Sequence, residues 1–268
     1  MGWVLFVALA ACLFLPTNYV IETPGPTMNV LGRETLDNGG SGRAVTSKED
    51  TIRIAGAPVK PTSGKLLMVT VNVEGSPRTP INAMQTLASW FHPQEAVMPR
   101  EVVFPIGETT RAYDKQISGQ MSSAQGLAQS VALKFIAQRH LANLDDPNIK
   151  IDMSAGDVGG PSAGMMFALG TIDKLTSGTM AGNQTIAGTG TISAEEQIGK
   201  IGGIRLKMLG ARRDGASWFL APSGNCSDVV GYVPAGLRVV KVSTLLQAYN
   251  AVVAIGQGQG ADLPTCTA

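Results

Sequence analysis

The chain has 268 residues and a net charge of +1, and its 44% hydrophobic and 15% charged residues are ordinary for a folded protein. A charge this close to neutral argues against a nucleic-acid partner. The Cys and His residues show no metal-ligand spacing, so we expect no metal and no cofactor. Leu66 follows Gly64-Lys65, and Ile201 follows Gly199-Lys200, so neither pair completes a P-loop and we expect no ATPase module in this chain.

An uncharged apolar segment, GWVLFVALAACLFL, occupies residues 2–15, and apolar character continues with few interruptions to Ile21. Its length is near the lower limit for a spanning helix, which needs about 20 residues. A cleaved signal peptide is the alternative, but the basic n-region is missing and no cleavage site is clear. We therefore expect residues 1–21 to be a retained, single-pass transmembrane anchor in the cell membrane. The absence of basic residues just after it favours export of the C-terminal part.

Residues 22–147 are predicted to form a mixed α/β region on the extracytoplasmic side. KLLMVTVNV at 65–73 is rich in β-branched residues and is typical of a strand. Thr79-Pro80 is typical of a helix start, and the helix is expected to run to about Phe91. A long amphipathic helix is predicted over 118–141.

Residues 148–255 are predicted to form a second domain. Strand patterns occur at 148–154, 184–193, 217–221 and 237–242, and helix patterns occur after Pro161 and at 202–213 and 243–253. Because strands and helices alternate irregularly, the fold class is α+β. Residues 256–268 are rich in Gly, Gln and Pro, and we expect them to be a disordered tail.

The three cysteines, Cys12, Cys226 and Cys266, do not form a disulfide framework. Cys226 and Cys266 could pair in an oxidising compartment. The unpaired state is the interpretation that we favour from the sequence.

Ser162 is the candidate nucleophile, within the small-residue turn GPSAG at 160–164. Pro161 is a good first residue for a helix, so we expect Ser162 in the first helical turn, with Gly160 and Pro161 shaping that turn. Free backbone N–H groups there can hold an oxyanion. The pattern G-x-S-x-G alone is weak, and both His92 and His140 precede Ser162, which excludes a Ser-His-Asp triad in hydrolase order.

A serine without histidine needs another base, and a lysine made neutral by burial can serve. Four lysines follow Ser162: Lys174, Lys200, Lys207 and Lys241. Lys207 lies in GGIRLKML, a helix start with apolar neighbours, on or beside the packed face of that helix. Lys200 lies beside Gly199 in a predicted turn and should be solvated. Lys207 is therefore the candidate base.

The motifs GPSAG, TGTI and IGGIRLK, in this order, resemble the proteolytic domain of Lon proteases, which are Ser-Lys dyad enzymes. The resemblance covers roughly 149–250, and the separation of 207 − 162 = 45 residues is close to the family's usual spacing. It implies the Lon proteolytic fold, and it implies that Thr189 hydrogen-bonds the catalytic lysine. YVIETPGPTMNVLG at 19–32 also resembles the segment after the anchor in bacterial membrane-bound Lon-like proteases.

Two features depart from the family pattern. Lon enzymes usually have Asp-Gly before the Pro-Ser, whereas this chain has Gly159-Gly160, with Asp157 nearby. Membrane-bound members usually carry a PDZ domain before the protease, but 137–152 passes almost directly from a helix to a strand. We therefore expect no PDZ domain and none of its substrate handling.

These observations predict a membrane-anchored serine endopeptidase that cleaves polypeptides without ATP by itself. By analogy with Lon-like domains, a homo-oligomeric ring is also expected. A catalytically inactive peptide-binding scaffold is the first alternative, although retention of both dyad residues argues against it. An esterase or amidase using the same dyad is the second alternative, which substrate profiling would separate from a peptidase.

Overall fold

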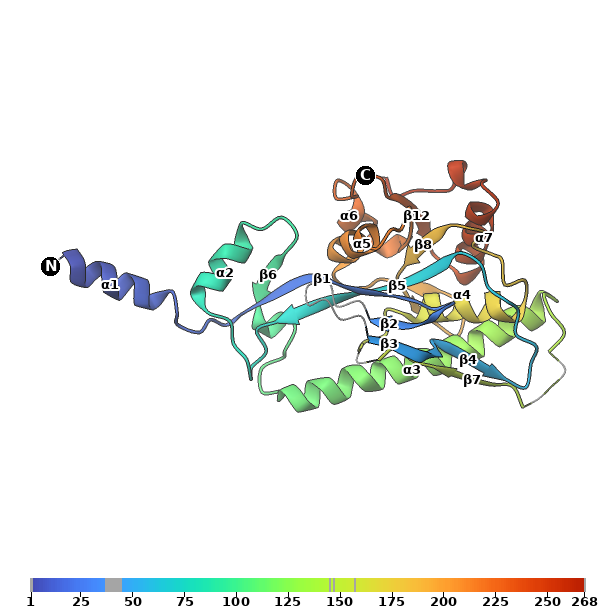
Figure 1. Cartoon of the computed structure of the whole chain (residues 1–268), viewed down its shortest axis with the longest axis horizontal. Coiled ribbons are helices and arrows are strands. Elements are labelled where there is room, and N and C mark those ends of the chain that lie inside the picture. Colours follow the sequence, from blue (N-terminus) through green and yellow to red (C-terminus); the bar gives the residue numbers. More distant parts are fainter. Residues whose placement is uncertain (1, 37–44, 145, 147, 157, 268) are drawn as a thin grey trace.

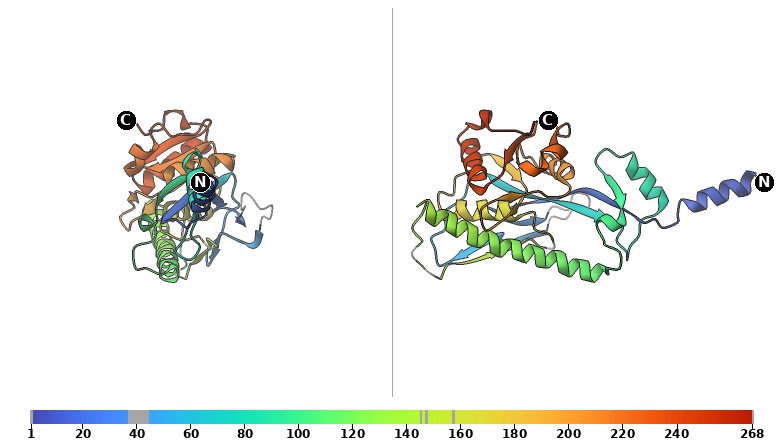
Figure 2. Two further views of the ribbon diagram at one scale, coloured as in Figure 1. Left: turned by 90° about the vertical axis from the view of Figure 1, so that its left-hand side faces the viewer. Right: turned by 180° about the vertical axis from the view of Figure 1, so that it is seen from behind.

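The computed structural model describes residues 2–36, 45–144, 146, 148–156 and 158–267. One helix, α1, projects from an end of an elongated molecule, and a small lobe containing α2 and β6 lies between it and the body (Figure 1 and Figure 2). The helices are α1 (Gly2–Cys12), α2 (Ala83–Trp90), α3 (Thr110–Gln138), α4 (Gly164–Leu175), α5 (Ile204–Arg213), α6 (Cys226–Val229) and α7 (Leu245–Gly256). Between these elements and after α7, short 3-10 helices lie at Arg100–Val102, Ser223–Asn225 and Gly260–Asp262.

A six-stranded sheet in the order β12-β11-β8-β5-β1-β6 forms the centre of the molecule. Its strands are β1 (Tyr19–Asn29), β5 (Lys65–Glu74), β6 (Ala96–Pro99), β8 (Thr185–Gly188), β11 (Trp218–Pro222) and β12 (Arg238–Val242). The four strands from β12 to β5 run parallel, whereas β1 is antiparallel to both of its neighbours. Two-stranded pairs join β2 (Arg33–Leu36) to β3 (Val45–Asp50), β4 (Ile52–Ala55) to β7 (Lys150–Met153), and β9 (Thr191–Ile192) to β10 (Ile198–Gly199).

The central sheet contains strands from both sides of the domain boundary expected at residue 147. β5, which precedes that boundary, pairs in parallel with β8, which follows it, from Lys65↔Thr185 to Met68↔Gly188. Regions 22–147 and 148–255 therefore share one sheet and one core. The fold is a mixed α/β arrangement in which the N-terminal strands complete the sheet of the C-terminal half.

Two hydrophobic clusters cover the two faces of the sheet. Ile186 and Leu220 pack in one cluster with α4, while Ala187 and Phe219, which alternate with them along the strands, pack in the other with Met208 of α5. Successive side chains of a strand point to opposite faces, so α4 and α5 lie on opposite sides of the sheet. The carboxyl end of β8 lies between them.

Helix α4 is the most deeply buried element, because all of its residues are buried. Its sequence, GMMFALGTIDKL, is apolar on nearly every side, as a helix surrounded by protein must be. At Gly170 a Cβ atom would lie 2.8 Å from Cγ2 of Val30, so a glycine is needed for this close packing. This buried helix directly follows the turn that carries Ser162.

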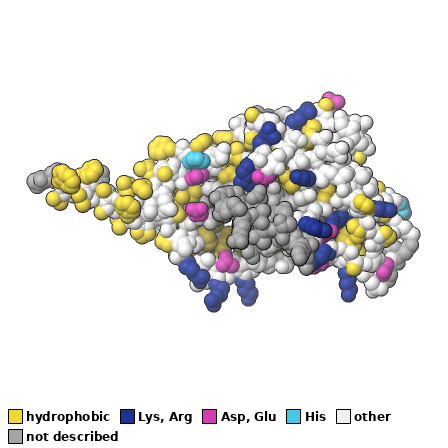
Figure 3. Space-filling view, viewed as in Figure 1, with side chains coloured by type: hydrophobic (Ala, Val, Ile, Leu, Met, Phe, Trp, Pro, Cys, Tyr) yellow, Lys and Arg dark blue, Asp and Glu magenta, His cyan; other side chains and the backbone are white. Residues whose placement is uncertain are grey.

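The N-terminal segment differs from the expected anchor over 1–21. Tyr19 begins β1, and Val20 is fully buried in the sheet, so the residues from Tyr19 onward belong to the body. The apolar helix itself covers Gly2–Cys12. Within the described ranges we find no helix that combines the length and the apolar character needed to cross a membrane. Figure 3 shows apolar side chains along α1 and onto the adjoining lobe.

The expected disordered tail was wrong for the described residues that follow α7. Cys226 and Cys266 form a disulfide, although the sequence favoured unpaired thiols. The backbone N–H of Lys241 donates to the carbonyl of Pro264 at 2.8 Å, which fixes the tail beside β12. A Cβ at Gly260 would lie 2.7 Å from the Trp218 ring, so the glycine allows the chain to pass over β11. Non-local contacts, rather than local propensity, order this segment.

Candidate active site

Ser162 and Lys207 meet at the carboxyl end of β8. Ser162 is half-buried in a turn just before α4, which begins at Gly164 rather than at Pro161 as the sequence predicted. Lys207 is on α5, and its residue is only 4% exposed. Its Nζ donates to Oγ of Ser162 at 3.0 Å. The sequence selected these two residues as nucleophile and base. The structure brings them together, although α4 and α5 lie on opposite sides of the sheet.

The segment after β8 holds the serine turn in place. Oγ1 of Thr189 donates to the carbonyl of Ser162 at 3.1 Å, and the N–H of Gly190 donates to the same carbonyl at 2.8 Å. The N–H of Met165 returns a bond to the carbonyl of Gly190 at 3.0 Å. Nζ of Lys207 also reaches Oγ1 of Thr189 at 3.5 Å. Thr189 thus contacts both members of the pair, which fits the orienting role that the resemblance implied.

Two backbone donors remain available beside the Ser162 hydroxyl. The N–H of Gly160 donates to the Ile117 carbonyl at 2.9 Å, and the N–H of Gly164 donates to the Pro161 carbonyl at 3.3 Å. Within the part of the chain that the structure describes, the N–H groups of Ser162 and Ala163 donate to no carbonyl or side chain. Because they precede the 12-residue helix α4, the helix dipole adds positive potential there. This arrangement can hold an oxyanion.

The site favours a neutral lysine. Burial lowers the pKa of the Lys207 amine from 10.5 to about 8, and the Glu22 carboxylate acts in the opposite direction. Lys200, the alternative base, forms an ion pair with Asp228 at 3.1 Å and is 57% exposed, which confirms that it is solvated. Of the four lysines that follow Ser162, all of which the structure describes, Lys207 alone is both buried and in contact with the Ser162 hydroxyl.

Glu22 is the site residue that the sequence reasoning missed. It lies on β1, and its Oε2 is 3.6 Å from the place of a Cβ at Gly203, the residue before α5 begins. Burial raises the pKa of the Glu22 carboxyl, and the Lys207 ammonium opposes that change. The same carboxylate contributes to the raised pKa of Tyr113 on α3, where burial is the larger cause. Its only sequence signal was a lone carboxylate in the segment YVIETPGP.

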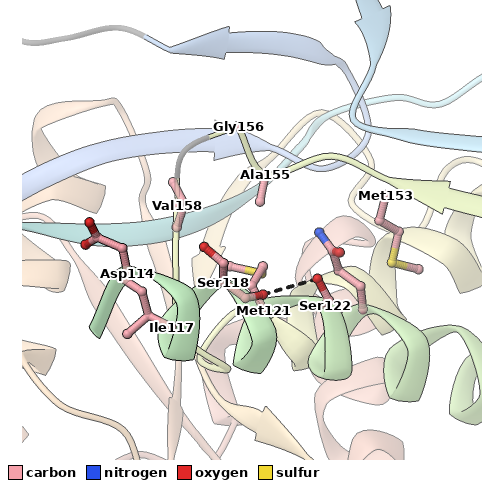
Figure 4. A pocket seen from close by; sticks show the side chains of 10 residues that line it. Asp114, Ile117, Ser118, Met121, Ser122, Met153, Ala155, Gly156 and Val158 are labelled. Atoms are coloured by element: carbon pink, nitrogen blue, oxygen red, sulfur yellow. Dashed lines mark hydrogen bonds between the residues drawn. The ribbon is translucent and has the colours of Figure 1, made fainter. Parts of the chain in front are cut away.

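A cavity of about 600 Å³ lies upstream of the serine turn, between α3 and the segment that follows β7 (Figure 4). Apolar side chains of both segments face it, together with polar groups of α3. The residues are Asp114, Ile117, Ser118, Met121, Ser122, Gln125, Met153, Ala155, Gly156 and Val158. Ile117 lines this cavity and its carbonyl accepts a hydrogen bond from the N–H of Gly160, so the cavity adjoins the serine turn.

The departure at Gly159 has a physical counterpart on α3. A Cβ at Gly159 would lie 2.6 Å from Cδ1 and 2.9 Å from Cβ of Ile117. An aspartate would not fit unless Ile117 moved. Asp157, the other carboxylate considered from the sequence, lies outside the described residues. Among those residues no cluster of His, Cys, Asp or Glu could hold a metal ion.

A serine hydroxyl beside a buried lysine, with backbone donors at a helix start, has the geometry of a Ser-Lys dyad, and here it lies within a mixed α/β core. The profile of the "Lon protease (S16) C-terminal proteolytic domain" matches residues 102–254, which is more than half of the chain. The chain therefore belongs to that family. Because the match begins at 102, α3 is part of the family domain, which begins well before the predicted boundary at 148.

Three relatives show how far the likeness extends. Lon protease 1 of Sorangium cellulosum (strain So ce56) is 31% identical over 147 residues, covering 50% of this chain and 18% of that protein. The Lon protease of Azospirillum brasilense is 28% identical over 140 residues, covering 51% of this chain and 17% of that protein. The Lon protease of Clostridioides difficile (strain 630) is 32% identical over 110 residues, covering 41% of this chain and 14% of that protein. The chain thus spans less than a fifth of the length of these curated relatives.

Proposed function

We propose that this protein is a serine endopeptidase that cleaves polypeptides through Ser162 and Lys207. The observation that carries the proposal is the 3.0 Å contact between Nζ of Lys207 and Oγ of Ser162, made by a lysine that is nearly inaccessible to solvent. A buried amine with a lowered pKa is a competent base near neutral pH, whereas a solvated one is not.

Neutral Lys207 takes the hydroxyl proton as Oγ of Ser162 forms a bond to the peptide carbonyl carbon. The N–H groups of Ser162 and Ala163 stabilise the resulting oxyanion. The Lys207 ammonium then gives its proton to the leaving nitrogen as the C–N bond breaks, which leaves an acyl-enzyme. Lys207 next takes a proton from water, the hydroxide attacks the ester, and the released Ser162 oxygen regains that proton.

Thr189 orients the base in this mechanism. Its hydroxyl hydrogen is committed to the Ser162 carbonyl, so its oxygen lone pairs are directed to the Lys207 amine. We place a substrate side chain in the cavity between α3 and the segment that follows β7. We further propose that this chain acts without ATP, since its sequence contains no P-loop.

We also propose that the apolar segment 2–15 holds the enzyme at the cell membrane, with the catalytic body on the extracytoplasmic side. Trp3, Phe6 and Phe14 are 82%, 69% and 65% exposed, which is unfavourable in water and favourable in lipid. The Cys226–Cys266 disulfide supports an oxidising compartment. The ring of copies that the resemblance implies stays a prediction.

Labelling with a serine-directed phosphonate tests the proposed chemistry. Wild-type protein should be labelled on Ser162, as mapped by mass spectrometry, and it should cleave casein at the same rate with and without ATP. Lys207→Ala should lose the label while keeping the wild-type circular dichroism spectrum. Equal labelling in wild type and Lys207→Ala would exclude the lysine as the activating base. Labelling without peptide cleavage would favour an esterase or amidase, and no labelling would favour the non-catalytic scaffold.

A further inference from the structure

In the lobe between α1 and the body, helix α2 buries polar residues and exposes apolar ones. The residues of α2 that are buried are Thr86 and Ser89. Its large apolar side chains are exposed instead, and the sequence of α2, AMQTLASW, contains no charge. Further exposed apolar side chains lie on the chain that returns from β6. The exposed set comprises Met84 (47%), Leu87 (51%), Trp90 (61%), Phe91 (83%), Val102 (68%) and Ile106 (87%).

The buried hydroxyl of Thr86 is satisfied inside the lobe. Oγ1 of Thr86 donates to the Asn82 carbonyl at 2.9 Å and lies 3.0 Å from Oγ1 of Thr17. Asn82 and Gln85 form a capping box: the Asn82 side chain accepts from the N–H of Gln85 at 2.8 Å, and the Gln85 side chain accepts from the N–H of Asn82 at 2.9 Å. The helix is therefore well formed, and its exposed apolar face is not a consequence of fraying. In water a helix normally buries its apolar face, so an exposed face of this kind marks a site where an apolar surface can bind.

The lobe is joined directly to the apolar N-terminal segment. The N–H of Met84 donates to the Leu13 carbonyl at 2.8 Å, and that of Ala83 donates to the Leu15 carbonyl at 3.0 Å. These two groups belong to the first turn of α2, whose N–H groups lack partners within the helix. The segment that leaves α1 thus satisfies the start of α2. Both elements lie at the same end of the molecule (Figure 1 and Figure 2).

We propose that the α2 lobe lies against the headgroup region of a lipid bilayer, with Leu87, Trp90 and Phe91 inserted at the interface. Tryptophan beside tyrosine is typical of this boundary, and the Trp90 and Tyr19 rings are 5.8 Å apart. The lipid surface is the occupant because the exposed face is continuous with the apolar segment that the proposed function assigns to the membrane. An interfacial helix of this kind orients the catalytic body relative to the bilayer.

Depth-dependent fluorescence quenching of the full chain tests the proposal separately from the anchor on which it rests. The protein is reconstituted in phosphatidylcholine vesicles whose acyl chains carry bromine either near the glycerol end or near the methyl end. The contributions of Trp3 and Trp90 are obtained by comparing wild type with Trp3→Phe and Trp90→Phe. Trp218, in the body, gives the common background.

The Trp90 contribution should be quenched at least about twofold more by bromines near the glycerol end than by those near the methyl end, as expected at the interface. Leu87→Gln with Phe91→Gln should remove at least half of that quenching. Leu246→Gln, which changes a 40% exposed leucine on α7, should leave it unchanged. Circular dichroism of each variant checks that it is folded.

The outcomes distinguish the lobe from the anchor. Quenched Trp3 with unquenched Trp90 would overturn the lobe proposal and leave the anchor standing. Quenched Trp90 with unquenched Trp3 would support the lobe and refute the anchor. If neither is quenched, both fail. If Trp90 is unquenched and sedimentation shows an oligomer that Leu87→Gln dissociates, a second copy covers this face and the lipid proposal is overturned.

Discussion

Nζ of Lys207 lies 3.0 Å from Oγ of Ser162, although the helices that follow or carry these residues pack on opposite faces of the central sheet. The contact is made where β8 ends, because Thr189 turns the chain there and bonds the Ser162 carbonyl. Thr189, which follows β8 directly, thus links both residues to the end of that strand. This geometry makes the lysine both buried and close to the hydroxyl, which are the two conditions for a neutral base.

Activity should follow the titration of Lys207. Its pKa is lowered to about 8, so the rate should rise with pH up to about 8 and level off above it. The profile of kcat/KM against pH for a fluorogenic peptide measures this. A profile that is flat from pH 6 to 10, or that falls as pH rises, would contradict a lysine base whose pKa is about 8.

Glu22→Gln should move that profile to lower pH. The Glu22 carboxylate raises the pKa of Lys207, so its removal leaves only the effect of burial, which lowers that pKa. Glu95→Gln, on the α2 lobe, is the control and should leave the profile in place. A Glu22→Gln profile that is unmoved, or moved to higher pH, would show that this carboxylate does not act on the lysine.

Lys207→Met should be inactive but at least as stable as wild type at neutral pH. The folded pKa of about 8 lies below the ordinary 10.5, so protonating the buried amine is disfavoured in the fold. The buried amine therefore lowers the free energy of unfolding by its full amount below pH 8, by less between pH 8 and 10.5, and not at all above 10.5. The full amount that corresponds to this pKa shift is about 3 kcal/mol. Thermal melting of both proteins at pH 7 and pH 10 measures the difference. A variant that melts clearly below wild type at pH 7 would indicate that Lys207 forms a favourable ion pair.

Gly159→Asp, which restores the residue that is usual in the family, should destabilise this protein by about 1–3 kcal/mol through overpacking. The new Cβ would lie 2.6 Å from Cδ1 of Ile117. Ile117→Ala should relieve the clash, so the double variant should be more stable than the sum of the two single changes predicts. Denaturant titrations of the four proteins give the coupling. Strict additivity would mean that Ile117 does not restrict this position.

Local patterns in the sequence predicted the elements that carry the site. The turn GPSAG before an apolar run indicated Ser162, and the apolar neighbours of Lys207 indicated a packed lysine. The strand predicted at 65–73 is β5, and the long helix predicted at 118–141 is part of α3. These features depend on periodicity within a single element, which a sequence shows directly.

The features that were missed depend on contacts between distant residues. The tail after α7 has a disordered composition, yet it is held by the Cys226–Cys266 disulfide and by β12. Glu22 enters the site only because β1 passes beside the start of α5. The expected boundary at 147 failed because β5 pairs with β8. No pattern local to any of these segments carries that information.

Casein cleavage by a set of four variants tests the dyad most directly. Ser162→Ala, Lys207→Ala and the double variant should each lower kcat/KM by at least about 1000-fold, and the double variant should be no worse than either single one, because the two residues act as a unit. Lys200→Ala, which removes a solvated lysine, should keep wild-type activity. If Lys207→Ala keeps substantial activity while it remains folded, or if Lys200→Ala is the inactive lysine variant, the account of a Ser162–Lys207 peptidase is wrong.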